Sequence, residues 1–394
     1  MTEPTQSTQS TQSTQSGGPL SGVRIIEMAS LAPGPHAAMM LADMGADVLR
    51  VDRPVPMESN TLLEVNLLER NRSSVSVDVK SDRGREALLR VIGDADGLIE
   101  SYRPGVMERL ELGPEACLTL NPRLVYGRVT GWGRAGPLAH AAGHDLNYLA
   151  LTGALHSMGD AGAPPPVPLN LLGDFAGGGM LLGFGMVCAL FEARASGRGQ
   201  VVDAAMVDGV SSLMTYIHGF RAGGHWSDQR GANILDGSAP YYRTYETKDH
   251  RYVAVAAVEG KFYRELIERI GLDLAELPAQ DDRSRWPELS ERLAEVFRSR
   301  TRSEWCELLE GTDACFAPVL DMGEAIDHPQ NEAWGTFVEV DGIPQPAPAP
   351  RFSRTVPRVP KPARSAIDDP DEELLRWGFD ADDIKVLRST GRVA

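Results

Sequence analysis

The sequence is poor in the residues that mark zinc proteins and disulfide-rich proteins. It has four cysteines in 394 residues, and none forms a Cys-x-x-Cys pair or lies at zinc-ligand spacing from a histidine. A disulfide framework and a structural zinc site are therefore not predicted. The sequence also lacks a Walker P-loop and the HExxH, GxSxG and GxGxxG motifs. Their absence removes several large enzyme classes from consideration.

The chain lacks a surplus of positive charge, since its formal net charge is −16. Nucleic acids and anionic membranes select basic surfaces, so neither partner is predicted. The longest apolar stretch, about residues 177–190, is glycine-rich and shorter than the ~20 residues of a membrane span. The Thr-Gln-Ser repeats of residues 5–16 contain no arginine and no apolar run. We predict a disordered tail there, and a cytoplasmic protein.

Strands alternate with helices in the first half of the chain. We predict strands at residues 23–28, 47–52, 74–79, 97–100, 124–130 and 200–205, and helices at residues 36–44, 83–91, 174–195 and 208–222. The alternation is typical of an α/β domain with a parallel or mixed sheet and right-handed crossovers. Asp52 ends the second strand, where dinucleotide enzymes carry a ribose-binding acid. Because no glycine fingerprint accompanies it, Asp52 alone does not indicate NAD.

The pattern of predicted strands and helices changes after Gly231. A strand at residues 252–257 and helices near residues 261–270, 287–299 and 302–310 indicate a smaller α+β unit, and a proline-rich segment follows Val319. The predicted organisation is a tail at residues 1–18, a large domain at 19–225, a small domain at 226–325 and a strap at 326–394. We expect the strap to return to the large domain.

Three residues could carry chemistry, and each has a plainer interpretation. His144 lies in the segment Gly-His-Asp-Leu-Asn-Tyr and could be an ordinary polar loop residue. Asp174 precedes an apolar helix, where capping is the commonest use of an aspartate. Glu259 precedes the helix near residues 261–270 and suits its first turn equally well. The spacing of these residues does not decide between chemistry and capping.

Eight segments of the chain match the sequence pattern of a known protein family, and this match favours catalytic roles for the three residues. The segments are residues 18–27, 45–54, 102–106, 142–148, 169–179, 199–209, 239–242 and 312–320. From Pro19 to about Arg354 the chain resembles the α-methylacyl-CoA racemases of the family III CoA-transferase superfamily. The resemblance implies a Rossmann-like large domain with a smaller α+β domain, and an interlocked homodimer whose active site lies at the subunit interface.

The resemblance also implies roles for individual residues. His144 and Asp174 occupy the positions of the family's acid/base pair, and Glu259 matches a third polar residue beside the histidine. Asn170 and Tyr242 are candidates for lining the acyl or active site. The implied CoA contacts are Arg53, Val77, Asp78, Val79, Lys80, Ser101, Tyr102, Arg103, Arg109, Gly143, Asp145, Leu146, Asn147 and Tyr148. The substrate would be an acyl-CoA thioester, with no separate cofactor and no metal.

The proposed roles agree with the chemistry of racemisation. The proton next to a thioester is weakly acidic, so a base must be positioned against it and the enolate oxygen must be stabilised. A neutral His144 and a protonated Asp174 on opposite faces of the enolate could exchange roles. Histidine has a suitable pKa without tuning, whereas the pKa of Asp174 would have to be raised.

Two other functions compete with this interpretation. In a family III CoA-transferase, Asp174 would attack the thioester as a nucleophile and form an acyl-enzyme anhydride. A non-catalytic acyl-CoA-binding protein would keep the arginines but would not need His144 or Asp174. The presence of His144 in its segment favours the racemase.

Overall fold

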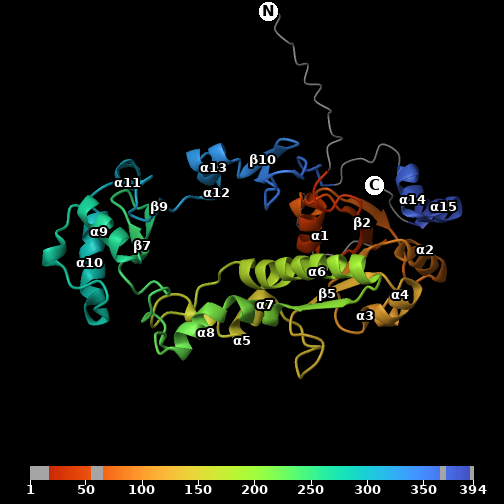
Figure 1. Ribbon diagram of the computed structural model, residues 1–394, viewed down its shortest axis with the longest axis horizontal. Coiled ribbons are helices and arrows are strands. Elements are labelled where there is room, and N and C mark those ends of the chain that lie inside the picture. Colours follow the sequence, from red (N-terminus) through yellow and green to blue (C-terminus); the bar gives the residue numbers. More distant parts are fainter. Residues whose placement is uncertain (1–16, 55–64, 364–369, 391–394) are drawn as a thin grey trace, which may run out of the picture. The chain divides into compact units, whose positions relative to one another are not determined.

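The chain forms two compact units. The computed structural model describes residues 17–54, 65–363 and 370–390, so most of the predicted tail lies outside the described residues (Figure 1). The first, the sheet unit, is formed by Met1–Gly143, Gly173–Gly209 and Gly335–Ala394. The second, the small unit, is formed by His144–Leu172 and Val210–Trp334. Compared with the predicted boundaries, residues 144–172 and 210–225 of the large domain and residues 326–334 of the strap lie in the small unit.

The sheet unit is built on six parallel strands. They are β1 (Arg24–Met28), β2 (Asp47–Asp52), β3 (Ser73–Ser76), β4 (Gly97–Glu100), β5 (Val125–Thr130) and β6 (Val201–Ala205). Their order is β3-β2-β1-β4-β5-β6, and every neighbouring pair is parallel. The predicted α/β class is confirmed. The order reverses between β1 and β4, which is the topological switch point of a doubly wound sheet.

Helices cover both faces of this sheet. They are α1 (Pro33–Asp43), η2 (Leu67–Glu69), α2 (Asp82–Gly93), α3 (Val106–Arg109), α4 (Pro114–Leu120) and α6 (Leu181–Ser196). One core joins Ile26 and Leu49 of the strands to Leu88 of α2 and Cys117 of α4. Successive residues of a strand point to opposite faces of the sheet, so the strand residues next to Ile26 and Leu49 point toward α1 and α6. Helix α6 approaches closely because β5 carries Gly127, where a Cβ atom would lie 2.4 Å from Met186 Sδ.

The apolar helix differs from its prediction. It begins with the π-helix η4 (Leu171–Met180) and continues directly as α6, so it starts three residues before Asp174. The interpretation of Asp174 as an N-cap was therefore wrong. Residues 171–196 are also long and apolar enough to cross a membrane by length and composition, with a mean hydropathy of 1.6 in an 18-residue window, which corrects the shorter estimate of residues 177–190. Helix α6 nevertheless packs on β5 and β6, as the core helix of a globular domain does.

The small unit contains a three-stranded antiparallel sheet. Strands β7 (Tyr242–Glu246), β8 (Tyr252–Ala256) and β9 (Phe316–Pro318) pair in that order. The helices are α5 (Asp145–Leu151), η3 (Leu155–Ser157), α8 (Thr215–Ala222), α9 (Gly260–Arg269), η5 (Leu274–Glu276), η6 (Arg283–Arg285), α10 (Trp286–Phe297), α11 (Arg302–Leu309), α12 (Met322–Ile326) and α13 (Pro329–Trp334). Helix α7 (Met206–Leu213) crosses the unit boundary at Val210. The predicted single helix at residues 208–222 is thus two helices.

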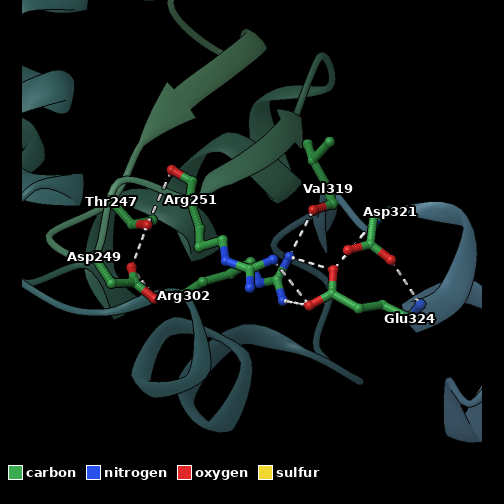
Figure 2. A network of polar contacts seen from close by, with 7 residues as sticks. All are labelled: Thr247, Asp249, Arg251, Arg302, Val319, Asp321 and Glu324. Atoms are coloured by element: carbon green, nitrogen blue, oxygen red, sulfur yellow. Dashed lines mark hydrogen bonds and ion pairs between the residues drawn. The ribbon is translucent and has the colours of Figure 1, made fainter.

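An ion-pair network fixes the segment that leaves the small sheet. Figure 2 shows Arg302 at its centre, donating to the Val319 carbonyl (2.7 Å) and to both carboxylate oxygens of Glu324. Arg251 also donates to Glu324 (3.0 Å), and Asp321 accepts the backbone N–H of Glu324 (2.9 Å). The hydrogen bonds that Arg302 and the Asp321 backbone N–H (3.1 Å) donate to the Glu324 carboxylate, together with the charges of Arg302 and Arg251, lower the pKa of Glu324 to about 2. The start of α12 is therefore tied to the start of α11.

The C-terminal segment returns to the sheet unit. It forms the hairpin β10 (Phe337–Val340) and β11 (Ile343–Pro346), followed by α14 (Pro370–Trp377) and α15 (Ala381–Thr390). Leu374 and Trp377 are fully buried in the core that contains α2. Arg24 of β1 stacks over the Trp377 ring, 4.4 Å from its centre. The two C-terminal helices thus complete one face of the large core.

Candidate active site

A cavity of about 700 Å³ opens at the carboxyl ends of the strands of the sheet unit. Its walls come from the ends of β1, β2 and β3 and from the segment after β4. Ligands of open α/β sheets bind at this edge, near the topological switch point. Seven predicted CoA contacts line it: Arg53, Val77, Asp78, Val79, Lys80, Tyr102 and Arg109. Residues far apart in the sequence are therefore brought to one place.

The cavity combines positive charge with apolar and aromatic surface. Arg53 lies over the Tyr102 ring, 5.1 Å from its centre, and the Tyr102 hydroxyl donates to the Ala29 carbonyl (3.0 Å). Arg53, Lys80 and Arg109 are exposed, so their charged groups are accessible to a ligand. Arginine pairs well with phosphate, and an arginine held over a ring is partly ordered before a ligand arrives. The cavity suits an anionic ligand with a flat apolar part.

The other seven predicted contacts lie outside the lining: Ser101, Arg103, Gly143, Asp145, Leu146, Asn147 and Tyr148. Ser101 forms a hydrogen bond with Ser30 (2.7 Å between the hydroxyl oxygens), and Arg103 is an exposed residue of the same loop. Sequence reasoning also missed lining residues: Met28, Val51, Asp52, Pro54, Val106 and Leu110. Most of these are apolar. The position of Asp52 could have been predicted to line the cavity, since this residue ends a predicted strand at the ligand-binding edge of the sheet.

A buried acid lies beneath the cavity. Glu100, the last residue of β4, is only 4% exposed and accepts the backbone N–H of Tyr102 (2.7 Å). Burial raises the pKa of Glu100 to about 7, although the Tyr102 N–H and the charges of Arg128 and Arg134 act in the opposite direction. This carboxyl group supports a residue of the cavity wall.

His144 lies at the N-cap of α5 in the small unit. It is exposed, and its backbone N–H donates to the Asn147 side chain (3.0 Å). In the same segment Leu146 and Asn147 are exposed, whereas Asp145 and Tyr148 are buried. Gly143 is the last residue of the first segment of the sheet unit. The His144 imidazole is thus presented at the surface of this unit by an ordered helix start.

Asp174 lies in the first turn of the π-helix η4 in the sheet unit and is partly buried. Phe175 packs on His36 of α1 with ring centres 4.8 Å apart. A Cβ atom at Gly179 would lie 2.5 Å from His36 Nδ1. Glycine is therefore needed for the close approach of η4 and α1. A π-helix is rare and occurs frequently at functional sites.

Glu259 occupies the N-cap position of α9, but its side chain makes no capping hydrogen bond and is exposed. Its capping interpretation is therefore not supported. Tyr242 begins β7 and is half-buried, and Asn170 is exposed just before η4. His144 and Glu259 belong to the small unit and Asp174 to the sheet unit. Among residues 17–54, 65–363 and 370–390, no group of three or more His, Cys, Asp or Glu side chains could hold a metal ion.

Comparisons with known proteins identify relatives along nearly the whole chain. The model of CoA-transferase family III matches residues 20–366. Alpha-methylacyl-CoA racemase from Mus musculus is 45% identical over 94% of this chain and 96% of the relative. The Homo sapiens protein of the same name is 43% identical with the same coverage. The crystal structure of Rv3272 from M. tuberculosis matches with a TM-score of 0.73 and 27% identity, over 88% of this chain and 97% of the other.

Proposed function

Because this chain belongs to CoA-transferase family III, we propose that it is an α-methylacyl-CoA racemase, which interconverts (2R)- and (2S)-2-methylacyl-CoA thioesters. The main observation in support of a CoA thioester as the ligand is the cavity at the carboxyl ends of the parallel strands. The presence of His144 in the segment Gly-His-Asp-Leu-Asn-Tyr supports proton transfer over acyl transfer. The similarity to the mammalian racemases points the same way.

The cavity suits the nucleotide end of CoA. Phosphate groups would pair with Arg53, Lys80 and Arg109, whose charges are concentrated in a chain of net charge −16. The adenine ring would pack on apolar wall residues such as Val79 and Leu110. The site therefore offers a local basic cluster in an otherwise acidic protein, as an anionic ligand requires.

Racemisation would proceed through a planar enolate. The neutral imidazole of His144 takes the α-proton from one enantiomer, so the C–H bond electrons move into the enolate. The carboxylic acid of Asp174 then donates a proton to the opposite face, and the roles reverse for the other enantiomer. Glu259 belongs to the same proposed set and would orient the histidine. The helix that begins at Leu171 presents the positive end of its dipole near Asp174, which favours the developing negative charge.

We also propose that the protein is a homodimer, with the active site at the subunit interface. The continuous helix η4–α6 leaves four apolar side chains exposed: Met180 (50%) at the end of η4, and Phe184 (69%), Val187 (41%) and Phe191 (79%) in α6. Their spacing of four, three and four residues places them on one helix face. Such a stripe is typical of an interface. Phe184→Glu with Phe191→Glu should lower the mass measured by sedimentation equilibrium to that of the monomer, whereas an unchanged mass would remove this face from the interface.

The function is tested by following α-proton exchange. A (2R)-2-methylacyl-CoA is incubated with the protein in D₂O, and the 2-methyl NMR doublet is monitored with and without a free carboxylic acid. Collapse of the doublet without an acceptor, lost in His144→Ala and in Asp174→Ala, is expected. His140→Ala, an exposed histidine outside the proposed site, is the matched control and should retain exchange.

The same experiment distinguishes the alternatives. Transfer of CoA to the added acid, requiring Asp174 but not His144, would establish the CoA-transferase. Binding of the thioester without exchange or transfer would indicate a non-catalytic acyl-CoA-binding protein.

A further inference from the structure

A buried group of four charged side chains lies behind the cavity. Glu27 of β1, Arg50 of β2, Glu69 of η2 and Arg72 are each at most 7% exposed. Arg50 lies 3.6 Å from Glu27 and 3.3 Å from Glu69, and Arg72 donates to Glu27 at short range. Two carboxylates therefore face two guanidinium groups. Their formal charges cancel, as burial in a core requires.

Asp52 is a fifth member of this group, and its charge is not needed for that balance. Its Oδ1 accepts a hydrogen bond from Arg50 Nε (2.9 Å). The two residues are two apart on β2, so their side chains lie on the same face of the sheet. Asp52 differs from the other four because its side chain is 34% exposed. Arg50 thus holds a carboxylate in one orientation while part of that carboxylate remains accessible.

The accessible part of Asp52 faces the cavity, where it is one of the lining residues. A carboxylate has about four acceptor positions, and Arg50 Nε uses one. Its neighbours in the lining, Arg53, Lys80 and Arg109, are cations that suit phosphates. Asp52 would repel a phosphate, so the ligand group opposite it must be a hydrogen-bond donor.

We propose that Asp52 accepts a hydrogen bond from the 2′-hydroxyl of the CoA ribose and is a specificity-determining residue of the cavity. This inference rests on the proposed function, because it takes CoA as the ligand. In doubly wound sheets, an acid at the end of the second strand is placed to accept from a ribose hydroxyl. In this chain Asp52 occupies that position although the glycine-rich turn is missing, and the hydrogen bond from Arg50 holds the Asp52 carboxylate in its orientation.

The test is a binding cycle in which the protein and the ligand are each changed. Dissociation constants of CoA and 2′-deoxy-CoA are measured by isothermal titration calorimetry for the unaltered protein, Asp52→Ala and Asp52→Asn. Removing either partner should weaken binding roughly tenfold or more, as expected for a hydrogen bond to a charged group. Asp52→Ala should then bind the two ligands equally. Asp82→Ala, an exposed acid of α2 outside the cavity lining, should retain the discrimination of the unaltered protein.

The possible outcomes separate this inference from the proposed function. If the unaltered protein binds CoA but does not distinguish it from 2′-deoxy-CoA, the ribose assignment is wrong. It is also wrong if Asp52→Ala keeps the full discrimination. The ligand comparison on the unaltered protein needs no variant, so it holds even if Asp52→Ala fails to fold. If the unaltered protein binds neither ligand, the proposed function itself is refuted.

Discussion

The buried carboxyl group of Glu100 predicts a pH dependence of stability with an unusual sign. Burial raises its pKa from the ordinary 4.5 to about 7. The folded state therefore binds more protons than the unfolded state between these two values. Stability from this group is highest at and below pH 4.5, decreases as the pH rises to about 7, and is constant above that. Most carboxylates in ion pairs have the opposite effect.

The magnitude follows from the size of the shift. A difference of about 2.5 pKa units corresponds to a loss of about 3 kcal/mol between pH 4.5 and pH 8. Because Glu100 is only 4% exposed, solvent screening reduces this value little. Glu100→Gln keeps the shape of the protonated side chain and an oxygen that can accept the Tyr102 N–H. The variant should match the unaltered protein near pH 5 and become progressively more stable than it up to pH 7.

The assay is differential scanning calorimetry of both proteins from pH 5 to pH 8.5. Glu108→Gln is the matched control, because Glu108 lies 2.6 Å from Arg134 and has a lowered pKa. Its replacement should cost about the same stability at every pH in this range, because a carboxyl group with a lowered pKa is ionised in both the folded and the unfolded state above pH 5. A pH-independent difference between Glu100→Gln and the unaltered protein would refute the argument, since it would mean that the Glu100 carboxyl ionises normally in the fold.

Four further substitutions test the packing and charge of the fold. Glu27→Gln should lower the free energy of unfolding by about 3–5 kcal/mol, measured by urea denaturation, because it leaves two buried arginines short of one negative charge. Gly179→Ala should lower the melting temperature through a clash with α1, whereas Gly183→Ala, which meets no atom within 4 Å, should leave it unchanged or raise it. The pKa of Glu324 is lowered to about 2, so its pairing with Arg302 stabilises the fold above pH 4.5 and is lost as the pH falls toward 2. Acid titration by circular dichroism should show a smaller loss over this range in Glu324→Gln.

The parallel sheet could be predicted because its strands are continuous apolar runs separated by helices. The predicted bounds of β2 and β4 agree with the structure, and those of β1, β5 and β6 differ by one residue at the start. Strands buried on both faces give this signal reliably. Seven lining residues of the cavity were predicted, and they followed from the resemblance to the family.

The π-helix could not be predicted from periodicity. Leu171 and Leu172 are apolar residues before the Asp174 that resembled a cap, and composition alone does not distinguish a helix that starts early from a loop. The deciding contacts are tertiary, since Gly178 and Gly179 pack on Pro33 and His36. The fixed orientation of Asp52 could not be predicted for the same reason. Its partner Arg50 is visible in the sequence, but the burial of Arg50 with Glu27 and Glu69 depends on how three segments of the chain pack together.

The turn between β1 and α1 connects the cavity with the helix that carries Asp174. Met28 lines the cavity, and the Ala29 carbonyl accepts the Tyr102 hydroxyl. Four residues later, Pro33 begins the contact with η4 that His36 and Phe175 continue. One short segment thus positions a wall of the proposed CoA site and the backbone of the proposed acid. A substitution that shifts this turn should change the KM for the thioester and the kcat of exchange together, whereas one confined to the cavity wall should change KM alone.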